Sequence, residues 1–286
     1  RDVRFDAHAT SQYCLALHVN DAYFKVSCID PITKHCLFIE TFNLAYSRAY
    51  RRVNAIEQLY QDHRLLANCN WSAITLSIGN QQYTLIPAHL FQEDKVSTYL
   101  DFTCLIGKDA VKYCVHPCVN VVVAFAMDSL LLNWFKKIYQ TARLRTIHQA
   151  SSLIEGSWKY LDGYSKELLP KLLVFVENNH FHIVVMQGKK LLYYNRFGYT
   201  TSDELLHYIL IVMRTLKLDP NVHEVIMGGD ITKSSLVHRK ARNYIRRISF
   251  TQRPSHLNFR RIFNAEAINS HFDVLSAHLC HQHSSH

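Results

Sequence analysis

Residues 172–230, LLVFVENNHFHIVVMQGKKLLYYNRFGYTTSDELLHYILIVMRTLKLDPNVHEVIMGGD, contain the pattern that decides the fold of this chain. Apolar runs separated by short polar turns predict strands at residues 172–176, 181–186, 191–197 and 223–227. Thr201 and Glu204 have the spacing of a capping box, which predicts a helix over 203–216, between the third strand and the fourth. The order is therefore strand, strand, strand, helix, strand.

The same order of elements occurs roughly 155 residues earlier in the chain. There the apolar runs predict a helix at 48–66 and strands at residues 13–19, 23–29, 35–42 and 73–78. The corresponding pairs are Asn20 with Asn178, Tyr23 with Phe181, and Phe42 with Phe197. A single matching hairpin could arise by chance, but five elements in the same order indicate a duplication.

Between the two copies lies a block with its own order of elements. We expect strands at 83–86, 111–115, 120–126 and 144–148, and helices at 93–100, 129–139 and 151–161. No low-complexity linker interrupts the chain. The sequence therefore predicts a first lobe at 1–150, which carries this inserted strand-helix segment, and a second lobe at 151–286, which carries a basic C-terminal segment.

Two copies of a three-stranded meander followed by a helix and a strand resemble the actin-like fold of actin, sugar kinases and Hsp70-type chaperones. Residues 119–152 also resemble the corresponding part of the actin-like proteins of type IV pilus and type II secretion machines. Most of residues 83–254 resembles a family of Bacteroidetes proteins with this fold, known as a domain of unknown function. The stretches that carry this last resemblance are TLIPAHLFQEDKVSTYLDF, LLYYNRFGYTTSDELLHYILIVMRTLKLDP, EVIMGGDI and YIRRISFTQRP.

The resemblance implies an α/β fold, a two-lobed actin-like (ribonuclease H-like) duplication with mixed sheets flanked by helices, and it implies no activity. In active members of the superfamily each hairpin turn carries Asp-x-Gly, which approaches the nucleotide phosphates and their Mg²⁺. Here the turns read Val19-Asn20-Asp21-Ala22 and Glu177-Asn178-Asn179-His180. Neither turn has a glycine, so side chains would obstruct a triphosphate, and we expect no catalytic residues.

A third element of the superfamily, the glycine pair that receives adenosine, has a counterpart in Gly228 and Gly229, which Asp230 follows. Glycine is otherwise scarce, with 8 residues in 286, and no phosphate-binding glycine motif is present. These three residues are therefore the candidates for residual nucleotide binding. The favoured alternative is a tight turn from strand to helix, where glycine is needed for a positive φ.

The basic residues are concentrated near the C-terminal end of the sequence. Nine cations and no acid occur in residues 233–261, which equals the formal net charge of +9. If residues 233–248 are helical, an apolar stripe forms on one side from Val237, Ala241, Tyr244 and Ile248. The candidates for binding an anionic partner such as nucleic acid are Lys233, Arg239, Arg242, Arg246 and Arg247. The alternative is a solvated face, or arginines paired with acids from elsewhere in the fold.

Other patterns carry less chemistry. Cys114, His116 and Cys118 alternate as in a strand, but they lack the usual spacing of zinc ligands, so we expect no metal. The longest apolar run, residues 119–127, is too short to cross a bilayer, and the N-terminus lacks a signal-peptide pattern. Scattered cysteines without such a signal favour the reducing cytoplasm.

These patterns favour a non-catalytic protein-binding or scaffold protein with degenerate nucleotide-phosphate loops and no cofactor. Its expected partner is another protein. Two alternatives remain open. One is residual ATP binding or weak kinase-like activity at Gly228 and Gly229, with Asp21 or Asp230 as a compensating carboxylate. The other is a nucleic-acid-associated factor that uses residues 233–261.

Overall fold

The chain forms two compact units. The structure, a computed structural model, describes residues 1–44, 49–63, 65–66, 70–107, 109–140, 142–162 and 169–282. The first unit comprises Arg1–Glu155, His256–Ile262 and Asp273–His286, and the second comprises Gly156–Ser255 and Phe263–Phe272. These units differ from the predicted lobes of 1–150 and 151–286, because two C-terminal segments group with the first unit.

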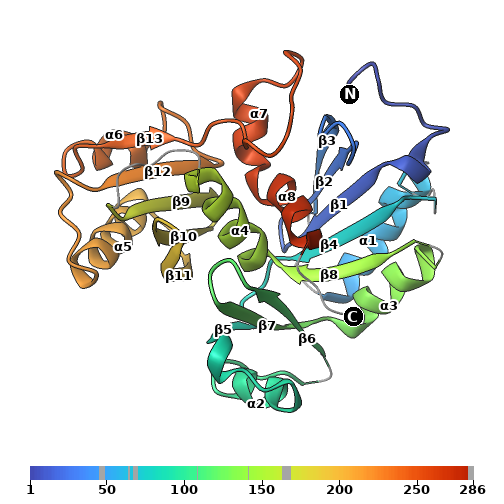
Figure 1. Cartoon of the computed structure of the whole chain (residues 1–286), viewed down its shortest axis with the longest axis horizontal. Helices are drawn as coiled ribbons and strands as arrows, with labels where there is room; N and C mark the ends of the chain where they lie inside the picture. The colour runs from blue at the N-terminus through green and yellow to red at the C-terminus, as the bar shows by residue number, and fades with distance from the viewer. Residues whose placement is uncertain are drawn as a thin grey trace. The chain divides into compact units, whose positions relative to one another are not determined.

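The first unit is built on a five-stranded mixed sheet (Figure 1). Its strands are β1 (Cys14–Val19), β2 (Tyr23–Ile29), β3 (Cys36–Asn43), β4 (Ala73–Ile78) and β8 (Leu144–His148). They lie in the order β3-β2-β1-β4-β8, where β1, β2 and β3 are antiparallel neighbours and β1, β4 and β8 are parallel neighbours.

The second unit repeats this sheet strand for strand. Its strands are β9 (Lys171–Glu177), β10 (His180–Gln187), β11 (Lys190–Gly198), β12 (Glu224–Gly229) and β13 (Ile248–Phe250). Their order is β11-β10-β9-β12-β13, with the same antiparallel meander and the same two parallel pairings. The predicted duplication of mixed sheets is confirmed by this topology.

The register of the two hairpins corrects the residue correspondence that the sequence predicts. Phe24 pairs with Phe42 across β2 and β3, and Phe181 pairs with Phe197 across β10 and β11. Phe24, and not Tyr23, therefore corresponds to Phe181. The prediction was wrong by one residue because both positions are aromatic.

A smaller sheet forms the predicted inserted segment of the first unit. Its antiparallel strands are β5 (Tyr83–Pro87), β6 (Ala110–His116) and β7 (Val121–Met127), in the order β5-β7-β6. The short helix α2 (Val96–Asp101) buries Val96 and Leu100 in one apolar cluster with residues of β5 and β7. Short 3-10 helices lie at Thr10–Gln12, Ala88–Leu90, Glu93–Lys95 and Ala277–Gln282.

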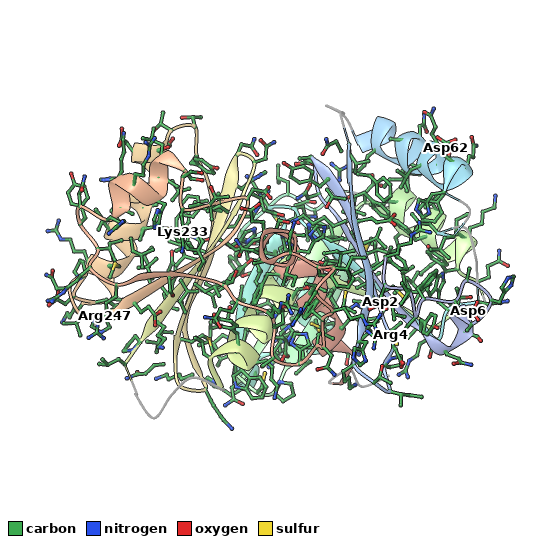
Figure 2. The ribbon with its side chains drawn as sticks, turned by 90° about the horizontal axis from the view of Figure 1, so that it is seen from above. Asp2, Arg4, Asp6, Asp62, Lys233 and Arg247 are labelled. Atoms are coloured by element: carbon green, nitrogen blue, oxygen red, sulfur yellow. The ribbon has the colours of Figure 1, made fainter. Side chains whose placement is uncertain are left out.

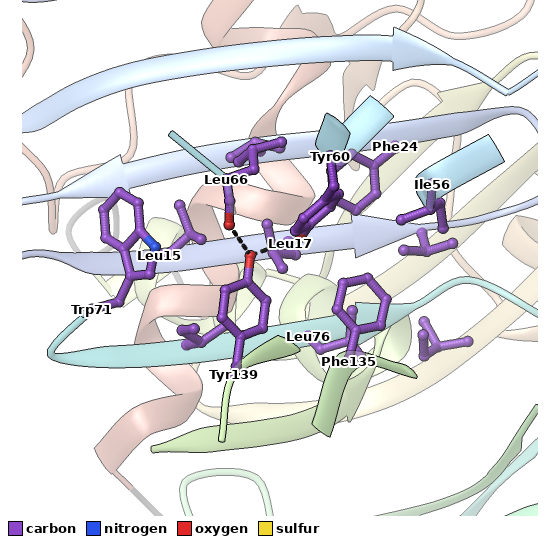
Figure 3. Close-up of a cluster of buried hydrophobic side chains, with 14 of the residues drawn as sticks. Leu15, Leu17, Phe24, Ile56, Tyr60, Leu66, Trp71, Leu76, Phe135 and Tyr139 are labelled. Carbon is purple, nitrogen blue, oxygen red and sulfur yellow. Dashed lines mark hydrogen bonds between the residues drawn. The ribbon is translucent and has the colours of Figure 1, made fainter. Parts of the chain in front are cut away.

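One face of the first sheet packs on the helices α1 (Ala49–Asp62) and α3 (Ser129–Ile138). Alternate residues of β1, such as Leu15 and Leu17, join this apolar core. Within it the Tyr139 hydroxyl donates to the Leu66 carbonyl at 2.9 Å and lies 2.7 Å from the Tyr60 hydroxyl (Figure 3). Arg48 and Arg64, both in the predicted helix 48–66, lie outside the described residues.

The remaining helices are α4 (Gln149–Asp162), α5 (Ser202–Thr215), α6 (Leu236–Ala241), α7 (Ala265–Ser270) and α8 (Phe272–Ser276). Helix α5 begins as predicted, since the Thr201 hydroxyl accepts from the Glu204 amide at 3.2 Å. Residues 233–248 do not form the continuous helix on which the apolar stripe depends. Only α6 is helical there, a turn follows it, and Tyr244 is 60% exposed instead of lying in an apolar stripe. Among the described residues no helix is long and apolar enough to span a membrane.

Candidate functional site

The first hairpin, residues 19–23 between β1 and β2, is closed by one of its own side chains. The side-chain oxygen of Asn20 accepts hydrogen bonds from the amides of Ala22 at 2.8 Å and Tyr23 at 2.7 Å. An asparagine that bonds its own backbone two and three residues ahead forms a stable turn. Asp21 is exposed and pairs with Arg52 on α1. The turn therefore uses two of its amide donors internally.

A buried polar cluster lies on the sheet face beside this hairpin. His18 and Lys25 are register partners on β1 and β2. The Lys25 ammonium lies 3.3 and 3.4 Å from the two carboxylate oxygens of Asp273 on α8, and both side chains are at most 2% exposed. Gln149 donates to the same carboxylate at 3.0 Å, and His18 Nδ1 lies 3.1 Å from Ser77 Oγ. These side chains contact one another within the first unit.

This cluster is not among the sequence-based predictions, although strand β2 carries a signal for it. Strand β2 alternates, with Phe24, Val26 and Cys28 in the apolar core and Lys25 and Ser27 between them. A lysine within a strand that is buried on both faces needs a buried partner. No local pattern indicates that this partner is Asp273.

The second hairpin, at Asn178 and Asn179 between β9 and β10, is fixed in a different way. The Tyr199 hydroxyl donates to the Asn178 carbonyl at 2.7 Å, and the Tyr199 amide donates to the Asn179 carbonyl at 3.0 Å. Both turn carbonyls are thus tied to the residue that follows β11. No glycine is needed in this turn, because both central residues have negative φ values.

The candidate residues Gly228, Gly229 and Asp230 lie at the end of β12. Gly229 has φ +85°, and a Cβ atom there would lie 2.0 Å from the Val176 carbonyl oxygen on β9. The Asp230 amide donates to that same oxygen at 2.7 Å. A side chain at Gly228 would meet Thr251 at 2.9 Å. Close backbone approach therefore accounts for Gly229, while nucleotide binding by these three residues stays a prediction.

Some of the candidate cationic residues line a cavity of about 690 Å³ in the second unit, and others do not. We call this cavity the basic cavity. Its lining comes from the segment after β12, from α6 and the turn after it, and from β13 and the residues that follow. Lys233, Arg242 and Arg246 line it, together with Arg253. Arg239 and Arg247 do not, and Figure 2 shows Lys233 and Arg247 at separate places. Anion binding by these residues stays a prediction.

The alternating Cys114, His116 and Cys118 lie on β6 and in the turn after it. His116 is buried, with Nδ1 2.8 Å from Glu155 Oε1 and Nε2 2.9 Å from Ser151 Oγ. Burial alone would lower the pKa of His116, but Cys114 and the Glu155 carboxylate outweigh burial and raise it to about 9. The Cys118 thiol donates to Glu155 Oε2 at 3.3 Å.

Ser151, His116 and Glu155 have the hydrogen-bond order of a nucleophile, a base and a carboxylate. Ser151 is fully buried, however, and no substrate carbonyl can approach its hydroxyl. The arrangement therefore acts as a packing element between β6 and α4.

Comparisons with known proteins find one matching family and several similar solved structures. A family model described as "Protein of unknown function (DUF3822)" matches residues 2–248. No curated protein matches the chain. A Bacteroides thetaiotaomicron protein, described as having an actin-like ATPase fold and unknown function, is 19% identical with a TM-score of 0.74, covering 86% of this chain and 93% of its own.

Two other solved structures are more distant. A chain of the PilM-PilN type IV pilus biogenesis complex is 11% identical with a TM-score of 0.68, covering 93% of this chain and 97% of its own. The cytoplasmic domain of EpsL, from the type II secretion system of Vibrio cholerae, is 8% identical with a TM-score of 0.42, covering 92% and 95%. The similarities to the Bacteroides thetaiotaomicron protein and to the chain of the PilM-PilN complex show the fold alone, and they confirm the predicted actin-like fold.

Proposed function

This chain belongs to the DUF3822 family, whose description carries no activity, and from its fold and its hairpins we propose that it is a non-catalytic protein-binding or scaffold protein. In this proposal the nucleotide-phosphate loops of the actin-like fold are degenerate. The fold then serves as a rigid frame that presents a surface to another protein.

The observation that carries the proposal is the closed turn of the first hairpin. A phosphate site needs backbone amides that point at the ligand and have no other partner. At this turn the amides of Ala22 and Tyr23 already bond to the side chain of Asn20, which is 4% exposed. Opening the turn would leave a buried side-chain oxygen without donors, at a cost of roughly 1–3 kcal/mol.

Lys25 also supports the proposal that the phosphate loops are degenerate. A lysine beside a phosphate loop can neutralise the ligand's charge, but here Asp273 already holds the ammonium in a buried pair. Freeing it would strand the carboxylate of Asp273, which is costlier than breaking a surface pair. A chain of similar fold occurs in the PilM-PilN complex, and this occurrence favours a protein as the partner.

Nucleotide binding is tested by thermal unfolding with and without MgATP, together with a phosphate-release assay. A site filled at about 100 times its Kd would raise the free energy of unfolding by about 2.7 kcal/mol. We expect no phosphate release above the rate without protein, and no such stabilisation in a variant whose basic cavity no longer binds ATP.

The Arg242→Gln/Arg246→Gln double variant is the control, because ATP could also bind in the basic cavity. A MgATP shift that persists in this variant would overturn the proposal. A shift that vanishes there would leave it intact and would point to the cavity.

The proposal that this chain binds another protein needs a separate test. Proteins captured by crosslinking in the native host would be purified and their Kd for this chain measured. Saturable binding of a purified partner is the expected result. Capture of nucleic acid alone, with no protein that binds again when purified, would contradict it.

A further inference from the structure

Cations from separate segments of the second unit line the basic cavity. Lys233 follows β12, Arg242 and Arg246 follow α6, and Arg253 follows β13. None of the described residues that line it is an aspartate or a glutamate. Four positive charges around one cavity repel one another unless an anion or solvent lies between them.

Three of these cations have no side-chain partner in the part of the chain that the structure describes. Lys240 on α6, by contrast, pairs with Asp203 at 2.7 Å. Within the described residues, the side chains of Lys233, Arg242 and Arg246 make no hydrogen bond or ion pair. They remain available for a ligand.

The backbone that carries the cations is nevertheless fixed. The Arg246 amide donates to the Pro220 carbonyl at 3.0 Å, and the Arg242 amide donates to the His238 carbonyl at 3.2 Å. His238 Nδ1 lies 2.9 Å from the Lys233 carbonyl oxygen. The Arg253 guanidinium donates to the Phe263 carbonyl at 3.2 Å, which sets its direction. The backbone that carries these charges, and the side chain of Arg253, are thus set before any ligand arrives, which lowers the entropy cost of binding.

The rest of the lining combines apolar with uncharged polar side chains. Ile245, Ile248 and Phe250 contribute to the wall, and the His238 ring lies 5.1 Å from the Phe250 ring. A volume of about 690 Å³ falls within the range of small-molecule sites. A site with several cations beside an apolar wall suits a ligand with separate charged and organic parts.

We propose that the basic cavity binds a small organic phosphate that carries at least two phosphate groups. Each phosphate ester carries roughly −1.5 to −2 charge at neutral pH, so two of them balance four cations. The planar guanidinium groups of Arg242 and Arg246 match phosphate oxygens in pairs, and the organic part lies against Ile248 and Phe250. Because the cations converge on one concavity, the arrangement favours a compact ligand over an extended nucleic-acid strand.

The proposal goes beyond the proposed function, since a protein-binding frame could carry such a ligand or lack it. The cavity belongs wholly to the second unit, whereas the closed turn of Asn20 belongs to the first. Either conclusion can therefore fail without the other.

Titration calorimetry on the full chain would use three probes: inorganic phosphate, fructose 1,6-bisphosphate and a short single-stranded oligonucleotide. We expect the bisphosphate to bind at least about tenfold more tightly than inorganic phosphate, because it contacts more of the cations. Binding should not require Mg²⁺. Absence of bisphosphate binding, or binding of the oligonucleotide alone, would overturn the proposal.

Two double variants remove the same charge from the same segment. Arg242→Gln/Arg246→Gln changes the lining and should weaken bisphosphate binding at least about tenfold. Arg239→Gln/Arg247→Gln changes two residues outside the lining. It should leave the Kd for the bisphosphate within about threefold of the wild-type value, because it changes only the net charge. Equal losses in both would refute a built site. If the first variant unfolds, Lys233→Gln provides the same comparison.

Discussion

Substitution of Gly229 by alanine tests why a glycine stands at the end of β12. The added Cβ would lie 2.0 Å from the carbonyl oxygen, 2.8 Å from the nitrogen and 2.9 Å from the carbonyl carbon of Val176. These are backbone atoms of β9, which is hydrogen-bonded to β10 on one side and to β12 on the other, so they cannot move cheaply. A positive φ costs a residue with a Cβ about 1–2 kcal/mol, and overpacking adds about 1–3 kcal/mol.

We therefore expect Gly229→Ala to lower the free energy of unfolding by about 2–5 kcal/mol, measured by urea denaturation with linear extrapolation. Gly107→Ala is the matched control, since Gly107 has φ +57° and nothing within 4 Å of the added Cβ. It should cost only the contribution of the positive φ, about 1–2 kcal/mol. Gly198→Ala should change little, because its nearest neighbour is the Asn179 carbonyl oxygen at 4.0 Å.

The reasoning is refuted if Gly229→Ala costs no more than Gly107→Ala. The close approach of β12 to β9 would then fail to explain the glycine. If the Gly229 variant instead kept its stability and lost a nucleotide-induced shift of the wild type, the nucleotide role of Gly228 and Gly229 would gain support.

The other predictions concern buried charges of the first unit. Lys25→Met and Asp273→Asn should each lower the free energy of unfolding by about 3–5 kcal/mol, and the double variant should cost less than their sum; strict additivity in a double-mutant cycle would show that the pair is not coupled. Since the folded pKa of His116 is about 9 against its ordinary 6.5, the stability it contributes is complete below pH 6.5 and is lost as the pH rises toward 9. Urea denaturation at several pH values should show this fall, and His116→Gln should flatten it; an unchanged slope in the variant would contradict the assignment.

The sheets could be predicted because their signals are local. Alternating or continuous apolar runs bounded by polar turns located β1 and β4 to within one residue. The sequence left the structure of residues 233–248 open, because their apolar spacing fits one long helix and also a short helix followed by a strand. The pairing of Val225 with Ile248 decides between the two, and this pairing depends on tertiary contacts.

The candidate sites were predicted less completely, because they depend on residues that are far apart in the sequence. Net charge identified Lys233, Arg242 and Arg246 as cationic candidates, but only the fold shows that Arg253 joins them around a cavity. Lys25 lies 248 residues from its partner Asp273, and no local pattern indicates that pairing.

The return of residues 256–262 and 273–286 to the first unit has a consequence for biosynthesis. Val274, Ala277 and Cys280 complete an apolar cluster with Ala16 and Ile147, so this part of the first unit stays uncovered while the second is being made. At roughly 5–20 residues per second, translation of the intervening segment takes several seconds or more. A nascent chain thus exposes this apolar surface to solvent for that time. Ribosome-associated chaperones can bind the exposed surface until the C-terminal helix has been synthesised.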